Sequence, residues 1–153
     1  MNNNSVKNVA TNKKARFEYF LEDSYEAGLV LQGSEIKSIR SGQVSLRESY
    51  VKIDGEEAWL IDAHIAPYHE ANRFNHDPKR PRKLLLHKKE IFRLFDKIRQ
   101  RGYAVIPTRM YLKHGKAKVE IALGRGKKEH DKRQTIAKKD AEREIRRAIR
   151  RKE

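Results

Sequence analysis

SYVKIDGEEAWLIDAHI, from Ser49 to Ile65, is the stretch of sequence that most clearly indicates the fold. Side chains from Ser49 to Ile53 alternate with a period of two, which predicts a β-strand with one buried face. Asp54-Gly55 is a strong hairpin-turn signal, and the β-rich run from Ala58 to Ile65 follows it as the return strand. The middle of the chain is therefore predicted to be a β-hairpin.

Further strands are predicted on both sides of this hairpin. Aromatic and aliphatic residues concentrate in short runs, which we interpret as strands at Phe17–Leu21, Tyr25–Leu31, Leu84–Leu86, Tyr103–Leu112 and Ala117–Leu123. The last two are predicted to form a second hairpin. A short helix is expected at Ser34–Arg40. The clearest helix spans about Lys88–Arg101, where apolar side chains recur at helical spacing at Ile91, Leu94, Phe95 and Ile98.

The order of these elements predicts a mainly β fold. Strands in meander order, with a helix inserted before the last hairpin, favour a small closed β-barrel of the oligonucleotide-binding (OB-fold) type with flanking short helices. A β-sandwich is the competing architecture. Three segments are predicted: a flexible N-terminal arm (1–11), a β-barrel domain (12–124) and a basic C-terminal tail (125–153).

The charge distribution points to a polyanionic partner. The 153 residues carry a net charge of +15. The tail alone contributes +7, from thirteen Lys/Arg and six Asp/Glu, and contains only three large aliphatic residues. Such a segment cannot bury enough apolar surface to offset its ordering entropy, so it is expected to be disordered when free and to become helical on its partner. Basic tails of this kind commonly bind nucleic acid.

Several other function classes lack support in the sequence. There are no cysteines, no apolar run long enough to span a bilayer and no signal-peptide pattern, so a cytoplasmic protein without a membrane partner is expected. His64, His69 and His76 lie near acidic residues but match no zinc motif, and neither a metal site nor a cofactor is expected. No nucleophile elbow, P-loop or paired-carboxylate pattern indicates an enzyme.

Four motifs in the chain are more specific than its composition. They are NKKARFEYF (12–20), YEAGLVLQGSEIKSIR (25–40), DPKRPRKLLL (77–86) and GKKEHDKR (126–133). In this order and spacing they resemble the SsrA-binding protein family (small protein B, SmpB), the partner of bacterial transfer-messenger RNA (tmRNA). The match is nearly continuous from about residue 8 to residue 134. Phe17 departs from it, because many relatives carry a histidine there.

The resemblance implies a fold and a function. It implies an oligonucleotide-binding-type barrel that binds the tRNA-like domain of tmRNA and brings the charged RNA into the A site of a stalled ribosome. The protein would stand in for the missing anticodon stem-loop, and translation would switch to the tag-coding frame of the RNA. This is trans-translation, a form of ribosome rescue, and the family has no catalytic activity of its own. The protein is expected to act as a monomer on the RNA.

The resemblance also assigns two sets of residues. The first matches the tmRNA-binding barrel face and comprises Asn12, Lys13, Arg16, Glu26, Arg82, Lys83 and Leu85. The second matches the segment that acts in the 16S rRNA decoding centre and the mRNA channel, and comprises Lys127, Lys128, His130, Asp131, Lys132, Arg133, Ile145, Arg146 and Arg147. Glu26 is expected to accept hydrogen bonds from RNA base or ribose groups.

Two alternatives remain open at the level of sequence. One is a structural ribosomal-type RNA-binding protein whose tail threads through rRNA. The other is a basic ribonuclease using His114 or His130 as a general base. The role of Phe17 and the partner of the loop at 67–83 are not decided by the sequence.

Overall fold

The computed structural model describes residues 6–152, with the side chains of residues 72, 73, 129–131, 151 and 152 excepted. The strands are β1 (Val6–Thr11), β2 (Tyr19–Leu29), β3 (Val44–Ser45), β4 (Tyr50–Asp54), β5 (Glu57–Ile61), β6 (His64–Ile65), β7 (Arg82–Leu85), β8 (Tyr103–Lys113) and β9 (Lys116–Gly126). The helices are α1 (Lys13–Glu18), α2 (Gly33–Arg40), the 3₁₀ helix η1 (His69–Phe74), α3 (Lys88–Ile98) and α4 (Glu129–Lys152).

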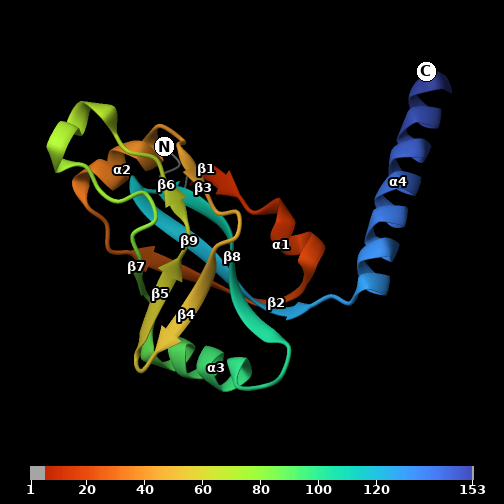
Figure 1. Cartoon of the computed structure of the whole chain (residues 1–153). Helices are drawn as coiled ribbons and strands as arrows, with labels where there is room; N and C mark the ends of the chain where they lie inside the picture. The colour runs from red at the N-terminus through yellow and green to blue at the C-terminus, as the bar shows by residue number, and fades with distance from the viewer. Residues whose placement is uncertain (1–5, 153) are drawn as a thin grey trace.

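Six antiparallel strands close on themselves in a ring. The sheet order is β1-β8-β4-β5-β7-β2-β9, and β8 pairs additionally with β9, so the ring runs β8-β4-β5-β7-β2-β9 and back to β8. β1 lies outside the ring on the edge of β8, and β3 pairs only with β6. Figure 1 shows the strands as one body with α3 at its lower end and α4 projecting to the right. The mainly β fold with short helices is confirmed.

The alternation of side chains along the strands separates a core from an outer surface. Ala27 in β2, Val119 in β9 and Met110 in β8 are cross-strand neighbours, and none of them is exposed. Ile91 and Leu94 of α3 close the same core from one end. Because side chains alternate between the two faces of a strand, residues next to these three in sequence face outward.

Both predicted hairpins form where their turn residues indicate. β4 and β5 pair from Tyr50–Ile61 to Asp54–Glu57. Gly55 has a φ of 62°, a left-handed conformation that glycine adopts at no steric cost. β8 and β9 join through His114 and Gly115, and their pairing extends over nearly the full length of both strands.

The structure corrects the N-terminal prediction. Residues 6–11 were expected to be part of a flexible arm, but Val6–Thr11 form β1 and pair with β8 from Lys113 to Arg109. Residues 1–5 lie outside the described part of the chain. Val6–Thr11 mixes apolar and polar residues without a regular alternation, so no strand was predicted there, and β1 pairs with the edge of β8. Phe17, expected in a strand, lies in α1.

The structure shows the C-terminal tail in a helical state. Its first two residues, Arg125 and Gly126, belong to β9, and Glu129–Lys152 form the helix α4. The disorder expected of the free tail stays a prediction. The segment is rich in Ala, Lys, Arg and Glu, which favour helix, and Glu142 pairs with Arg146 one turn later at 3.9 Å.

Candidate nucleic-acid interface

The clearest candidate site lies on the outer face of β2 and is centred on Glu26. The Tyr111 hydroxyl of β8 donates a hydrogen bond to Glu26 Oε2 at 2.5 Å, and Lys113 Nζ lies 3.5 Å from the same oxygen. The hydrogen bond from Tyr111 and the nearby Lys113 ammonium lower the pKa of Glu26, although burial opposes the shift. The side chain is an exposed, ionised acceptor held in place at one of its two oxygens.

Tyr111 is the residue that holds this carboxylate. It is 4% exposed. Burial and the hydrogen bond to Glu26 both raise the pKa of Tyr111, so its hydroxyl stays protonated and remains a donor. The Arg109 guanidinium lies 4.5 Å from the centroid of the Tyr111 ring and pairs with Glu120 at 2.6 Å. Arg109 is therefore fixed by Glu120 on the adjacent strand β9, whereas Tyr111 is fixed by Glu26 on β2, across β9.

The strand register places Tyr111 in an outward-facing row across five strands. The cross-strand neighbours in this row are Asn8, Tyr111, Lys118, Gly28 and Leu85. Leu85 is 54% exposed. A Cβ at Gly28 would lie 3.3 Å from the Leu85 Cβ, so glycine lets this row pack closely. The row and Glu26 together form a surface that offers an aliphatic side chain, a cation and an anion around the buried Tyr111 ring, and we call it the platform.

Four of the predicted RNA-binding residues besides Glu26 are accessible. Lys13 and Arg16 are exposed on α1, and Leu85 is exposed on β7. Lys83 is 42% exposed in its side chain and lies 3.6 Å from Glu57. Leu85 lies on the platform beside Gly28, whereas Lys83 faces Trp59 on the β5 side of β7.

Arg82 was expected to contact RNA, but its side chain points into the protein. It has no exposed surface, and its Nε donates to Glu35 Oε2 at 2.5 Å while Nη1 donates to the Ala63 carbonyl at 2.8 Å. Burial alone would raise the pKa of Glu35, but hydrogen bonds from Arg80, the Gln32 N–H and Arg82 outweigh it and lower the pKa. Arg82 fastens β7 to α2 and cannot reach RNA in this structure.

Asn12 is a second correction. Its side chain is 7% exposed and both of its polar atoms are used. Oδ1 accepts from the Ala15 N–H at 3.3 Å as the N-cap of α1, and Nδ2 donates to the Pro107 carbonyl at 2.9 Å. Asn12 therefore positions α1, which carries Lys13 and Arg16.

The tail residues fall into two groups in the structure. Lys127 is tied to the body: its N–H donates to the Glu18 carbonyl at 2.8 Å, and its ammonium donates to the Arg16 carbonyl at 3.1 Å and to Thr135 Oγ1 at 3.0 Å. Lys132 Nζ lies 6.0 Å from the Phe17 ring centroid. These contacts fix the N-terminal end of α4 against α1.

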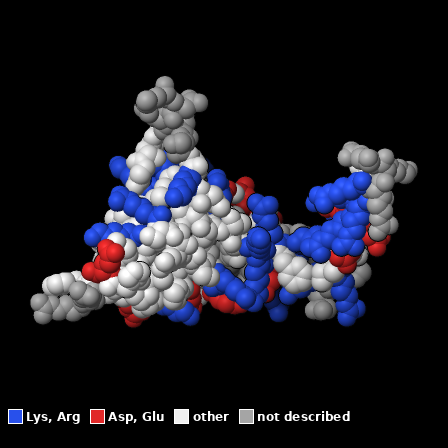
Figure 2. All heavy atoms as spheres, turned by 90° about the horizontal axis from the view of Figure 1, so that it is seen from above, with Lys and Arg blue, Asp and Glu red and all other residues white. Residues whose placement is uncertain are grey.

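The other predicted tail residues are exposed or not described. Lys128, Arg133, Ile145, Arg146 and Arg147 are exposed, while the side chains of His130 and Asp131 lie outside the described part of the structure. Figure 2 shows Lys and Arg side chains along the projecting helix and gathered where it meets the body. The tail therefore presents positive charge on an arm that stands away from the strand ring.

The histidine-rich loop is structural where it is described. His76 is 6% exposed and lies 2.8 Å from Ser34 Oγ and 2.9 Å from the Ile65 carbonyl. No group of three His, Asp or Glu side chains among those described could hold a metal ion. None of the described helices is both long and apolar enough to cross a membrane.

Sequence reasoning missed four residues of the platform region: Arg109, Tyr111, Lys113 and Lys118. The first three follow one another at a spacing of two in the predicted strand Tyr103–Leu112 and its end. That period places them on one face, which could have been recognised as an outward polar face carrying an aromatic ring. The proximity of these residues to Glu26 could not be predicted, because it depends on the position of β9 between β2 and β8.

Comparison with known proteins decides the family. The family model described as SmpB protein matches residues 9–151, nearly the whole chain. The chain belongs to the SmpB family. The match includes Glu26, the platform residues from Gly28 to Lys118 and α4 as far as residue 151.

SmpB relatives are similar over almost their full length. The chain is 58% identical over 144 residues to the SsrA-binding protein of Desulforudis audaxviator, covering 94% of each chain. It is 54% identical over 149 residues to the SsrA-binding protein of Halothermothrix orenii, covering 97% of this chain and 96% of the relative. The SsrA-binding protein of Bacillus pumilus is 55% identical over 142 residues, covering 93% and 91%.

An SmpB structure shares the fold. A chain in the solved structure described as "tmRNA-SmpB: a journey to the center of the bacterial ribosome" matches with a TM-score of 0.66 and 42% sequence identity. The match covers 78% of this chain and 84% of that one. The solved chain thus shares most of the architecture described above.

Proposed function

We propose that this protein binds the tRNA-like domain of tmRNA and serves as the RNA-binding adaptor of trans-translation. The relatives are named SsrA-binding proteins, and the solved SmpB chain is described with tmRNA and the ribosome. The observation on this chain that carries the proposal is the exposed Glu26 carboxylate, held by Tyr111 within a basic protein. A carboxylate on a surface that binds RNA repels the phosphates. It can favour binding only by accepting hydrogen bonds from base amino or imino groups or from ribose hydroxyls.

The platform supplies the specific part of this binding. Leu85 and the aliphatic stem of Lys118 offer apolar contact to a base or ribose, and the Lys118 and Lys113 ammonium groups attract phosphates. Lys13 and Arg16 add positive charge on α1. Phosphate contacts position the RNA, whereas Glu26 discriminates among its donor groups.

The tail supplies a separate, ribosomal contact. We infer that Lys127, Lys128, His130, Asp131, Lys132 and Arg133 act in the decoding centre and that α4, with Ile145, Arg146 and Arg147, enters the vacant mRNA channel. The supporting observations are the net charge of the tail and its projection from the body (Figure 1). The protein would thereby replace the missing anticodon stem-loop during A-site delivery, in the cytoplasm and without catalysis of its own.

Binding to the isolated tRNA-like domain tests the proposal. At physiological salt and with excess tRNA as competitor, the wild-type protein is expected to bind with nanomolar affinity, and Glu26→Ala is expected to weaken binding. Lys89→Ala, which removes an exposed charge on α3, serves as a control. Binding that tRNA displaces fully would mean that charge alone attracts the RNA, and the proposal would fail.

A further inference from the structure

The connection between β9 and the tail helix is short. β9 ends at Gly126, which still pairs with Tyr19 of β2, and α4 begins at Glu129. Only Lys127 and Lys128 lie between the strand and the helix. α1 contacts α4 beside this connection (Figure 1). The contacts of the connection with α1 therefore decide in which direction the tail leaves the body.

Lys127 is engaged on every side that its ammonium group offers. The group has three N–H donors. It donates to the Arg16 carbonyl at 3.1 Å and to Thr135 Oγ1 at 3.0 Å, and it lies 5.1 Å from the centroid of the Phe20 ring. The backbone N–H of Lys127 donates to the Glu18 carbonyl at 2.8 Å. Carbonyls in the last turn of a helix lack partners within it, so Lys127 caps α1 and ties it to α4 at the same time.

A second contact holds the same face of α4. Lys132 Nζ lies 6.0 Å from the centroid of the Phe17 ring on α1. Lys132 and Thr135 are three residues apart and therefore neighbours on the helix surface. Among the α4 residues whose side chains the structure describes, these two alone are partly buried, whereas residues 136–150 are all exposed. The helix is thus held over its first two turns, and Phe17 supplies part of the surface that holds it.

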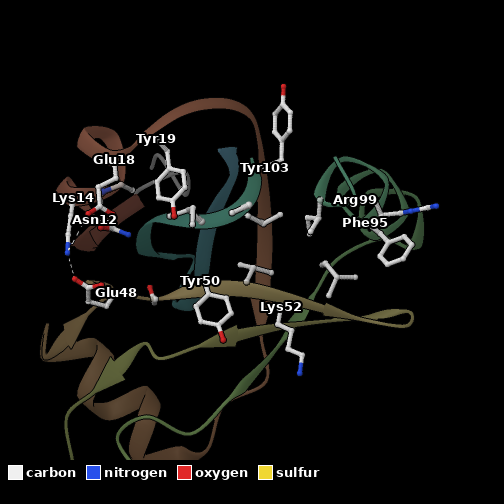
Figure 3. Close-up of a pocket in the computed structure, with 18 residues that line it drawn as sticks. Asn12, Lys14, Glu18, Tyr19, Glu48, Tyr50, Lys52, Phe95, Arg99 and Tyr103 are labelled. Atoms are coloured by element: carbon white, nitrogen blue, oxygen red, sulfur yellow. Dashed lines mark hydrogen bonds and ion pairs between the residues drawn. The ribbon is translucent and has the colours of Figure 1, made fainter. Parts of the chain in front are cut away.

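α1 is itself fixed on the body. Ala15 is 3% exposed, and Asn12 joins the start of the helix to β8 through the Pro107 carbonyl. Lys14 forms an ion pair with Glu48, which shortly precedes β4, and Figure 3 shows the Lys14 side chain extending from α1 toward this carboxylate. Contacts of α1 with two different strands or their flanking residues leave it little freedom to turn. α1 can therefore pass the orientation of the body on to α4.

The two surfaces of the protein meet at α1. The side chains of Lys13 and Arg16 are exposed and belong to the predicted tmRNA-binding set, whereas the Arg16 and Glu18 carbonyls hold the tail. From Thr135 the helix continues for roughly 26 Å to its end, so a change of about 20° in its direction would displace that end by about 9 Å. This displacement is close to the diameter of a helix. A tail that has to enter a channel therefore depends on its direction.

We propose that Phe17, Phe20, Lys127, Lys132 and Thr135 form a joint that fixes the direction of the tail relative to the tmRNA-binding face. Lys127 is then a positioning residue: it serves the tail in the decoding centre by holding its angle, since its ammonium group already has partners. The inference rests on the proposed function in one respect, namely that the tail enters the ribosome while tmRNA is bound to the body.

The direction of the tail can be measured on the free protein by the distance between two spin labels. The chain has no cysteine, so labels attach only at introduced cysteines, Lys89→Cys on α3 and Lys138→Cys on α4, which are both exposed positions. Thr135→Val removes the hydroxyl acceptor without changing the charge, and Thr135→Ser keeps the hydroxyl. Lys127→Gln removes the ammonium group, and Lys139→Gln is the control for the same loss of charge on the exposed part of α4.

We expect one narrow distance distribution for the wild type, Thr135→Ser and Lys139→Gln, and a broader one for Thr135→Val and Lys127→Gln. Thr135→Val should also lower the tagging yield about threefold at limiting protein, because a hydrogen bond to a charged group is lost. Thr135→Ser should restore that yield. Since the charge is unchanged, Thr135→Val should bind the tRNA-like domain within about twofold of wild type.

Three results would overturn the joint. The first is a broad distribution in the wild type, and the second is a distribution as narrow as that of the wild type in both Thr135→Val and Lys127→Gln. The third is normal tagging by a variant whose distribution has broadened, because the direction of the tail would then not matter to the ribosome.

The failure of this inference is distinguishable from the failure of the proposed function, since the distances are measured without RNA. If the wild-type protein neither binds the tRNA-like domain specifically nor supports tagging, the proposed function fails, whatever the spin labels show. If the wild type does both and Thr135→Val matches it in distance distribution and in tagging, only the joint fails.

Discussion

Replacing Tyr111 with phenylalanine tests whether the platform depends on a held carboxylate. The change removes one hydroxyl and leaves the buried ring, its packing and the Arg109 guanidinium above it in place. A hydrogen bond to a charged group contributes about 1.5–3 kcal/mol, but Glu26 is 40% exposed and water will replace part of the lost bond. We therefore expect a loss of about 1 kcal/mol, which is roughly fivefold in affinity for the tRNA-like domain.

The double-mutant cycle separates this effect from a general one. Affinity is measured for wild type, Tyr111→Phe, Glu26→Ala and the double variant, with Tyr103→Phe as a control on the same strand. If Tyr111 acts through Glu26, its substitution weakens binding in the wild type but has almost no effect once Glu26 is alanine. Equal losses in both backgrounds would show that Tyr111 does not act through Glu26.

The pKa of Glu26 gives a second readout of the same variant. In the wild type the Tyr111 hydrogen bond holds the pKa of Glu26 below its ordinary value of 4.5. The ionised Glu26 carboxylate therefore stabilises the folded state at pH values above 4.5. This stabilisation is lost as the pH falls through the depressed pKa. In Tyr111→Phe the pKa should rise toward 4.5, as measured by NMR titration of the Glu26 carboxyl carbon. The stability difference between the two proteins should shrink as the pH falls below that value.

Three further predictions follow from the positions of other side chains. Arg82→Ala should destabilise the protein by about 3–5 kcal/mol, because it leaves the buried Glu35 short of a partner, whereas Lys83→Ala should leave thermal unfolding nearly unchanged; a folded Arg82→Ala protein with normal stability would contradict this. Asn12→Ala should lower the unfolding free energy by about 1 kcal/mol through the loss of the α1 cap, and an unchanged denaturation midpoint would argue against the capping role. Deleting residues 134–153 should leave affinity for the tRNA-like domain within about threefold, since that RNA meets the platform, but abolish tagging on stalled ribosomes; a large loss in a gel-shift titration would show that the tail contributes to tmRNA binding.

Most of the fold could be predicted from local patterns. Alternation and the Asp54-Gly55 turn located the central hairpin, and the spacing of Ile91 and Leu94 located α3, because these signals come from residues close in sequence. β1 was not predicted because Val6–Thr11 mixes apolar and polar residues without a regular alternation, and its pairing with the edge of β8 is a tertiary contact. The helical state of the tail was predicted from its composition, but the contact of Lys127 with α1 was not, because it joins residues far apart in the sequence.

The candidate site was only partly predictable, for a related reason. Motif resemblance cannot tell an outward side chain from an inward one, and Arg82 and Lys83 are adjacent residues that face opposite sides of β7. Arg82 forms a buried ion pair with Glu35 on α2, and this pair depends on a tertiary contact that the local sequence does not show. Tyr111 escaped notice because its role depends on Glu26, 85 residues earlier in the chain.

The most direct test of the central claim is tagging in a purified translation system. Ribosomes stalled on a truncated message are supplied with alanyl-charged tmRNA, with and without this protein, and the nascent chain is analysed for the added peptide tag. We expect the tag to appear only when the protein is present, and we expect Glu26→Ala to reduce its yield at limiting protein concentration. Tagging at the same rate without the protein, or none in its presence, would show that this protein is not the adaptor of trans-translation.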